Sequence, residues 1–313
     1  MPAFLTHYLF GRLQYEKMAP GTVKNAISAQ KKVFALGLAG PDIFFYFLPD
    51  FLLGRKKVGS VMHEECCGRF LRNLTREAVT YRGEERGIAL AYLAGFLGHY
   101  ELDTHCHPYI YAYIDKRAEE IAAKHLQEGN VKPVSGHQKT GIHFQYEGAM
   151  DYYFLRHYTG KTPAEMNQNR LTRLTAKQKS VIARLVAAAY NRTYAVPNLS
   201  VTSMKLVLAS VKFVMFCIRD PHGRRERLLA PIEKRMYGHL FSAGLFVNNN
   251  CYGIEEEEFC RLQPLFEKGK KEYAEVLEYL DLYLEAAEEE KEAAEWWLFR
   301  KIGSRSYHSG ETV

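Results

Sequence analysis

This chain of 313 residues contains no CxxC pair of cysteines, which argues against a Cys-rich zinc site and against a disulfide framework. Its six cysteines stand at positions 66, 67, 106, 217, 251 and 260. The N-terminal segment has no basic stretch, no long apolar run and no small-residue cleavage site. We therefore expect no secretory signal and a cytoplasmic protein.

Long uninterrupted apolar runs are also scarce. The apolar window 43–53 is broken by Pro49, and the window 201–218 is interrupted by Lys205 and Lys212, so we predict no transmembrane segment. The chain lacks a run of Arg and Lys interleaved with aromatic residues, so no stable nucleic-acid complex is expected. These absences leave the oligomeric state open.

Charge is spread unevenly along the chain. The net charge is +6, but residues 251–313 carry 8 basic and 16 acidic side chains, whereas residues 1–250 carry 34 basic and 20 acidic ones. The first 250 residues therefore have a net charge of +14, which favours anionic partners such as phosphate esters or lipid headgroups.

Apolar residues recur with helical periodicity almost throughout, and strict alternation is rare, so the sequence predicts an all-α fold. The breaker-rich segment 129–141 is the expected long loop. Helices are expected near residues 3–15, 22–37, 60–79, 86–103, 112–128, 143–158, 176–192, 201–218, 223–241 and 263–300.

Eight of the twelve histidines lie in the first 143 residues, and six of these stand beside helical apolar stripes: 7, 63, 99, 105, 107 and 143. On the helix expected over 86–103, His99 and Asp103 continue an apolar face that begins with Tyr92 and Phe96. A carboxylate on a buried face needs a compensating partner, and a divalent cation supplies one while using both side chains as ligands. The remaining histidines are scattered and receive no role.

The same one-turn spacing recurs at His143 and Glu147 on another predicted helix. His63 begins a third apolar stripe, and Asp42 lies in an apolar stretch after a Gly-Pro step. Taken singly, each pair is more often an ordinary helix pair, and Asp42 is more often a turn or cap residue. Their joint occurrence favours a metal cluster.

One ordered set of residues resembles the zinc-dependent phospholipase C family, whose members are all-helical, multi-zinc phosphodiesterases related in fold to zinc nucleases of the P1/S1 type. The segment GFLGHYELDTHCHPYI is especially similar to bacterial intracellular-type members. The matching set is His7, Pro41-Asp42, His63, His99-x3-Asp103, His107-Pro108 and His143-x3-Glu147. The resemblance covers residues 1–160 and implies a multi-helix bundle of phospholipase C/P1 nuclease type, with residues 161–313 adding C-terminal helices that complete or cover it.

The resemblance also implies a ligand set. One zinc ion would be held by Asp42, His63, His99 and Asp103, and a second by His107, His143 and Glu147. Asp103 would bridge toward a third ion held with His7. His105 is the alternative to His107 at the second site, with His107 preferred because of its His-Pro step, and Cys106 is expected to point away.

The N-terminus departs from the family pattern. Secreted members use the amine and carbonyl of an N-terminal tryptophan as zinc ligands, whereas both tryptophans here stand at 296 and 297. We therefore expect two zinc ions and a weak or variably occupied third position. The amine of Pro2, exposed if Met1 is removed, is one substitute ligand.

The function implied by the resemblance is zinc-dependent phosphodiester hydrolysis, with a zinc-bound hydroxide attacking phosphorus. Asp42 is the carboxylate expected to orient or deprotonate the attacking water, and Glu147 is the second candidate. An anionic phosphoester is the expected substrate, with a phospholipid headgroup as one example. The alternatives are a zinc nuclease or nucleotidase of P1/S1 type and a non-catalytic zinc-binding interaction protein.

Overall fold

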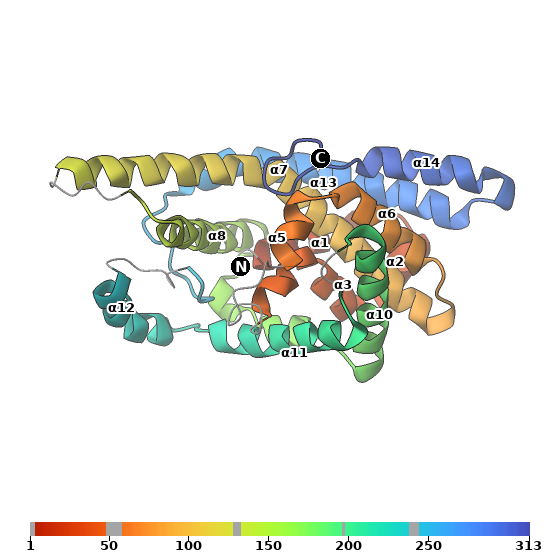
Figure 1. Ribbon diagram of the computed structural model, residues 1–313, viewed down its shortest axis with the longest axis horizontal. Helices are drawn as coiled ribbons and strands as arrows, with labels where there is room; N and C mark the ends of the chain where they lie inside the picture. The colour runs from red at the N-terminus through yellow and green to blue at the C-terminus, as the bar shows by residue number, and fades with distance from the viewer. Residues whose placement is uncertain (1–3, 48–57, 128–132, 196–197, 238–243) are drawn as a thin grey trace.

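The structure is a computed structural model that describes residues 4–47, 58–127, 133–195, 198–237 and 244–313 (Figure 1). Within these residues β structure is limited to two isolated bridges, Arg219 with Val247 and Arg305 with Thr312. The all-α prediction is confirmed. The first half contains α1 (Phe4–Lys17), α2 (Thr22–Ala29), α3 (Lys31–Gly37), the 3-10 helix η1 (Gly40–Tyr46), α5 (Val58–Glu64), α6 (Cys67–Ala78), α7 (Gly83–Gln127) and α8 (Gly136–Thr159). The second half contains η2 (Pro163–Glu165), α9 (Gln168–Leu171), α10 (Ala176–Thr193), α11 (Val201–Ile218), α12 (Arg224–Tyr237), α13 (Glu256–Glu285), η3 (Glu288–Glu290) and α14 (Lys291–Ile302).

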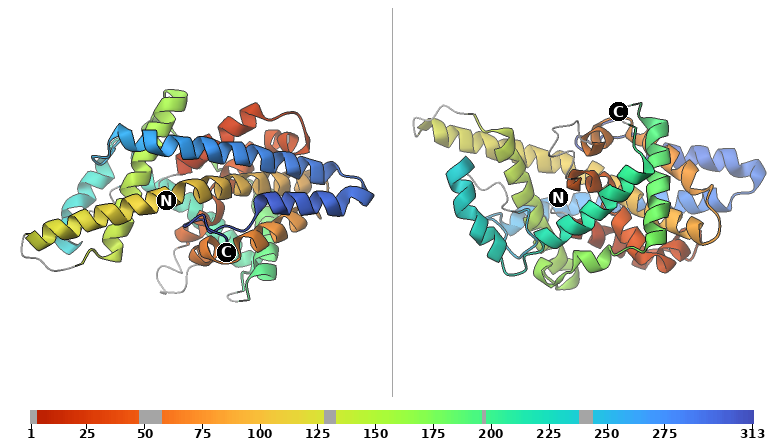
Figure 2. Two further views of the ribbon diagram at one scale, coloured as in Figure 1. Left: turned by 90° about the horizontal axis from the view of Figure 1, so that it is seen from above. Right: turned by 60° about the horizontal axis from the view of Figure 1, so that its bottom comes forward.

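Helix α7 is the central element. It runs for 45 residues, and α13 lies beside it in all the ribbon views (Figures 1 and 2). The sequence predicted one helix ending at residue 103 and another beginning at residue 112. This prediction is wrong, because α7 continues through Pro108. A proline inside a helix costs about 3 kcal/mol. The side chains of Cys106, His107 and Ile110 around it are buried, and this tertiary packing outweighs the cost.

Three other predicted helices are divided. The helix expected over 60–79 breaks at Cys66, which has the left-handed φ of 53°. The helix expected over 22–37 breaks at Gln30, and the one expected over 263–300 breaks between α13 and α14. Hydrophobic periodicity continues across these breaks because the separate helices bury their apolar faces in the same core.

Glycines allow the elements around α7 to approach closely. A Cβ on Gly37 of α3 would lie 2.4 Å from the carbonyl oxygen of Tyr92, and one on Gly95 of α7 would lie 2.3 Å from the carbonyl oxygen of Phe34. Gly40 has a φ of +48°, and a Cβ there would lie 2.3 Å from the ring of His99. The glycine before Asp42 therefore places η1 directly against the imidazole of α7.

The residues after 160 extend along two sides of the first half. Helix α13 packs against α1, α2, α7 and α8, and α11 packs against α10 and η1. By length and composition α11 qualifies as a possible membrane span, although a third of that window is buried inside the protein. The absence of a transmembrane segment and the division at residue 160 both stay predictions.

Candidate metal centre

All eight predicted metal ligands lie in one cluster, contributed by five elements. Seven of the eight are buried, and the eighth, His143, has a side chain 20% exposed. Helix α1 provides His7, η1 provides Asp42, α5 provides His63, α7 provides His99, Asp103 and His107, and α8 provides His143 and Glu147. The one-turn spacings on α7 and α8 therefore face each other, as the sequence pattern predicted.

Asp103 is at the centre of the cluster. Its Oδ1 lies 3.1 Å from His7 Nε2, and its Oδ2 lies 2.9 Å from His99 Nε2 and 3.6 Å from His107 Nδ1. The donor atoms of His7, His99 and Asp103 are close enough together to hold one ion. His7 is thus grouped with His99 as well as with Asp103. The resemblance implied that only Asp103 would link His7 to the first zinc site, so His7 lies closer to that site than expected.

Two further groups of three donors flank Asp103. In the first, Asp42 Oδ1 lies 3.0 Å from His63 Nε2, and Asp42 Oδ2 lies 3.8 Å from His99 Nε2. In the second, Glu147 Oε1 lies 3.0 Å from His143 Nε2 and 3.5 Å from His107 Nε2. The geometry brings the implied ligands together, while their binding of zinc stays a prediction.

Backbone carbonyls orient three of the imidazoles. The Nδ1 atoms of His63, His99 and His107 lie within hydrogen-bond distance of a carbonyl oxygen, at 2.6 Å, 3.1 Å and 3.0 Å; the acceptors belong to Gly59, Leu38 and Tyr307. A carbonyl oxygen can only accept, so each Nδ1 carries the proton. Each Nε2 then presents a lone pair to the interior, the arrangement that metal-binding histidines use.

The orphaned polar atoms of this cluster fit a bound cation. His99 Nε2 and Asp103 Oδ2 are buried without a hydrogen-bond partner although they lie 2.9 Å apart, and His143 Nε2 is also without one. A lone pair facing a carboxylate oxygen at this distance is repulsive unless a proton or a metal ion lies between them. Imidazole nitrogens with carboxylate oxygens form a donor set that suits zinc.

The metal-free cluster shows strongly coupled charges. Burial favours the neutral acid at Asp103, but His107, His99 and His7 outweigh it and hold the pKa of Asp103 well below its usual range. Burial likewise opposes the charged form of His107, yet Asp103 and Glu147 raise its pKa to about 9. The pKa of Glu147 is lowered because His143 and His107 outweigh its burial. Positive charge is strongly favoured among these carboxylates.

His105 lies in a different cluster, which corrects the interpretation that placed it near the second site. Its Nδ1 donates to the carbonyl oxygen of Glu101 at 2.7 Å, and its Nε2 lies 3.3 Å from Glu272 Oε1. Arg305 joins both carboxylates, at 2.7 Å from Glu101 and 3.7 Å from Glu272. The donor atoms of Glu101, His105 and Glu272 are also close enough together to hold an ion. The guanidinium of Arg305 already supplies a cation there.

The chain end after α14 contributes residues that the sequence interpretation missed. Tyr307 donates its N–H to the carbonyl oxygen of His63 at 3.0 Å, and its own carbonyl receives the Nδ1 proton of His107. The ring of His308 lies 5.4 Å from that of His63 and 6.2 Å from that of His107. Burial and those two imidazoles lower the pKa of His308 to about 4. No spacing signal links residue 308 to ligands at least 161 positions earlier.

Asp151 is a second missed residue, one turn after Glu147 on α8. Its Oδ1 accepts hydrogen bonds from the backbone N–H and the hydroxyl of Thr6, each at 2.7 Å. Burial raises the pKa of Asp151 despite these bonds. The contact between Asp151 and Thr6 fixes the start of α1 and with it the adjacent His7. The substitute ligand predicted at Pro2 lies outside the described residues.

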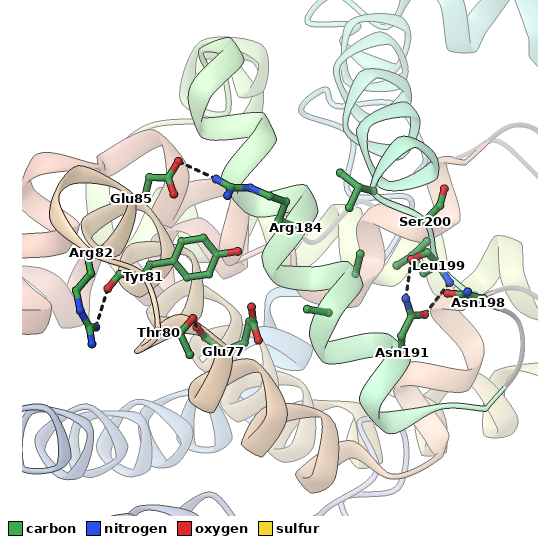
Figure 3. Close-up of a pocket in the computed structure, with 13 residues that line it drawn as sticks. Glu77, Thr80, Tyr81, Arg82, Glu85, Arg184, Asn191, Asn198, Leu199 and Ser200 are labelled. Atoms are coloured by element: carbon green, nitrogen blue, oxygen red, sulfur yellow. Dashed lines mark hydrogen bonds and ion pairs between the residues drawn. The ribbon is translucent and has the colours of Figure 1, made fainter.

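Space beside the cluster is small. A cavity of about 20 Å³ is bordered by His7, Asp103, His107 and Glu147, which is room for about one water molecule. A much larger groove of about 740 Å³ lies between α6, α10 and the start of α11. It contains none of the predicted ligands, and Figure 3 shows its polar lining, with Arg184 paired to Glu85. The candidate functional site is therefore the histidine and carboxylate cluster.

An all-helical fold around a buried histidine and carboxylate cluster fits a zinc hydrolase. A family model described as zinc dependent phospholipase C matches residues 6–195, and the chain belongs to that family. No curated protein and no solved structure gives a match to the chain. The matched range includes all eight predicted ligands and extends beyond the 1–160 covered by the resemblance.

Proposed function

We propose that the protein is a phosphodiester hydrolase of phospholipase C type that works with zinc. The observation that carries the proposal is the convergence of three donor groups: two share His99, and His107 of the third lies 3.6 Å from Asp103. Family membership supports the same chemistry. Two ions are the expected complement, because eight donor side chains exceed what one tetrahedral zinc uses.

Zinc held by such donors acts as a Lewis acid on a phosphoryl oxygen and makes water acidic enough to supply hydroxide near neutral pH. Asp42 is the carboxylate we assign to orienting and deprotonating the attacking water. It is paired with His63 at 3.0 Å, while its second oxygen keeps the longer distance of 3.8 Å to His99. Glu147 Oε1 faces both His143 and His107, which favours a ligand role for it over a base.

The charge of the chain supports the proposed substrate class. The net charge of +14 in residues 1–250 favours an anionic phosphodiester, and we propose a phospholipid headgroup ester handled in the cytoplasm. A zinc nuclease or nucleotidase of P1/S1 type would use the same donor set. A non-catalytic zinc-binding interaction protein would hold metal tightly without turnover.

One experiment separates these functions. The zinc-loaded protein is offered a soluble short-chain phosphatidylcholine and a single-stranded nucleic acid, with elemental analysis of the same sample. We expect at least two zinc ions per chain and release of phosphorylated headgroup. Turnover of nucleic acid alone favours the nuclease, and bound zinc without any hydrolysis favours the interaction protein.

The catalytic role of Asp42 is tested with Asp42→Asn, against Asp115→Asn as the matched control. The Asp115 carboxylate is exposed and pairs with Lys139 on the surface, so its variant should retain activity. Loss of a general base lowers the rate by about 100-fold to 10,000-fold. A wild-type rate in the zinc-loaded Asp42→Asn protein would rule out this assignment.

A further inference from the structure

Helix α11 is apolar on two faces but buries only one of them. The face against α10 and η1 is formed by buried residues, which are Met204, Val207, Leu208, Val211, Met215 and Ile218. On the outer face Leu206, Phe213 and Phe216 are 54%, 58% and 62% exposed. These three recur at offsets of seven and three and form one stripe along the helix. A helix of a water-soluble domain carries polar residues on such a face.

Helix α12 continues this surface. None of its side chains described in the structure is buried, and Leu228, Leu229 and Ile232 are 73%, 36% and 53% exposed. They follow each other at helical spacing and give α12 an unpartnered apolar face. Figures 1 and 2 show α11 and α12 in succession along one edge of the molecule. Six of the eleven large apolar side chains exposed in the described residues lie on these two helices.

Basic residues surround the apolar stripe. Residues 201–237 contain eight Lys or Arg and three Asp or Glu side chains. Two of the three acids are turned inward. Asp220 is buried and accepts the backbone N–H groups of Arg224, Arg225 and Glu226. Glu226 is bonded to Asn248 and Tyr252. All eight basic side chains are exposed, so the solvent-facing part of this segment is cationic as well as apolar.

One arginine links the two helices. The guanidinium of Arg225 lies 5.9 Å from the ring centre of Phe216 and donates to its carbonyl oxygen at 3.2 Å. This contact fixes the start of α12 beside the end of α11. The α11 stripe therefore ends beside the start of α12, and we name the exposed apolar side chains of the two helices together the α11–α12 surface, defined by Leu206, Phe213, Phe216, Leu228, Leu229 and Ile232.

We propose that the α11–α12 surface docks the protein on the surface of an anionic phospholipid bilayer. Aromatic and leucine side chains enter the interface, and the surrounding lysines and arginines contact anionic headgroups. Helix α11 lies on the bilayer and does not cross it, because its inner face is packed against α10 and η1. A second copy of the chain is a poor partner, since it would bring two surfaces of the same positive charge together.

The docking surface is independent of the proposed catalysis. It lies beyond residue 195, where the family match ends, and shares no residue with the metal centre. The two are nevertheless neighbours, because α11 packs against η1, the element that carries Asp42. Vesicle binding without turnover tests the surface, so its failure is distinguishable from a failure of the phospholipase assignment.

The test is cosedimentation with vesicles of phosphatidylcholine alone and of phosphatidylcholine mixed with phosphatidylglycerol. The full chain should bind the mixed vesicles and release them at high salt. Phe213→Ser/Phe216→Ser should lower the partition coefficient by at least about tenfold. Lys205→Gln/Lys212→Gln should lower it by about fivefold for each lysine removed, and only on anionic vesicles.

The matched control is Leu282→Ser/Trp297→Ser, which removes exposed apolar side chains from α13 and α14. It should bind vesicles like the wild type. Thermal unfolding and hydrolysis of a soluble short-chain ester should be unchanged in all three variants, which shows that they are folded. The proposal is overturned if the full chain binds neither vesicle, or if the phenylalanine variant binds as well as the control. A dimer in solution that the phenylalanine variant dissociates would also overturn it.

Discussion

Helix α7 carries two clusters of histidine and carboxylate on opposite faces. Asp103 and His107 face the metal centre, while Glu101 and His105, each two residues earlier, face Glu272 and Arg305. Two residues correspond to a rotation of about 200° around a helix axis. Residue types and spacing are the same on both faces, yet the two clusters differ in how their negative charge is compensated.

The difference lies in the positively charged group that compensates the carboxylates. Arg305 donates to Glu101 at 2.7 Å, and burial raises the pKa of Glu101 to about 7 even with this partner. Within the described residues, the ion-pair partners of Asp42, Asp103 and Glu147 are all histidines. A histidine and carboxylate cluster therefore indicates a metal site where the structure supplies no guanidinium or ammonium group to it.

The largest expected effect is from Asp103→Asn. This carboxylate faces three imidazoles, so its loss should lower zinc affinity by at least about 100-fold and disturb the whole cluster. Glu101→Gln on the opposite face is the control and should leave the zinc content unchanged. Metal counts by native mass spectrometry decide the comparison. Equal zinc loss from both variants would contradict the assignment of the two faces.

The two neighbouring histidines give a narrower comparison. His107→Ala should lower zinc affinity by about 10-fold to 100-fold, because its Nε2 lies 3.5 Å from Glu147 and its Nδ1 is held by a carbonyl. His105→Ala should keep the wild-type affinity, measured by competition with a chelating dye. If zinc affinity falls with His105→Ala and not with His107→Ala, the assignment is reversed.

The metal-free protein should respond to pH through His107. Burial lowers its pKa, but Asp103 and Glu147 raise the folded-state value to about 9 from 6.5. A raised histidine pKa adds stability that is complete below about pH 6.5 and is lost as pH rises to about 9, by about 3 kcal/mol at most. Urea unfolding of chelator-treated protein measures this decline. His107→Ala should remove the decline, and a wild-type profile in that variant would assign it to another group.

The smallest expected effect is from His7→Ala. His7 contacts Asp103 at 3.1 Å, but the groups containing Asp42 and Glu147 do not use it. The variant should therefore lose at most one ion and keep its helical circular dichroism. Loss of all zinc would show that the N-terminal position is a full member of the cluster.

The spacing of residues predicted which side chains share a helix face better than it predicted where the helices begin and end. One-turn spacing on apolar faces identified His99 with Asp103 and His143 with Glu147, because residues four apart share a helix face. The same reasoning failed at Pro108 and Cys66, where tertiary packing extended one helix and a left-handed residue ended another. Local propensity is weaker than the burial of a central helix.

The sequence by itself determined the all-α class and the one-turn pairs His99 with Asp103 and His143 with Glu147, because these follow from periodicity within single helices, whereas the full ligand set was implied by the family resemblance. Only the tertiary structure decided that His105 faces Arg305 and Glu272, and that Tyr307 and His308 lie against the metal centre. It also decided that α11 leaves one apolar face uncovered. These contacts join segments far apart in the chain, and local spacing carries no information about which distant segment covers a given face.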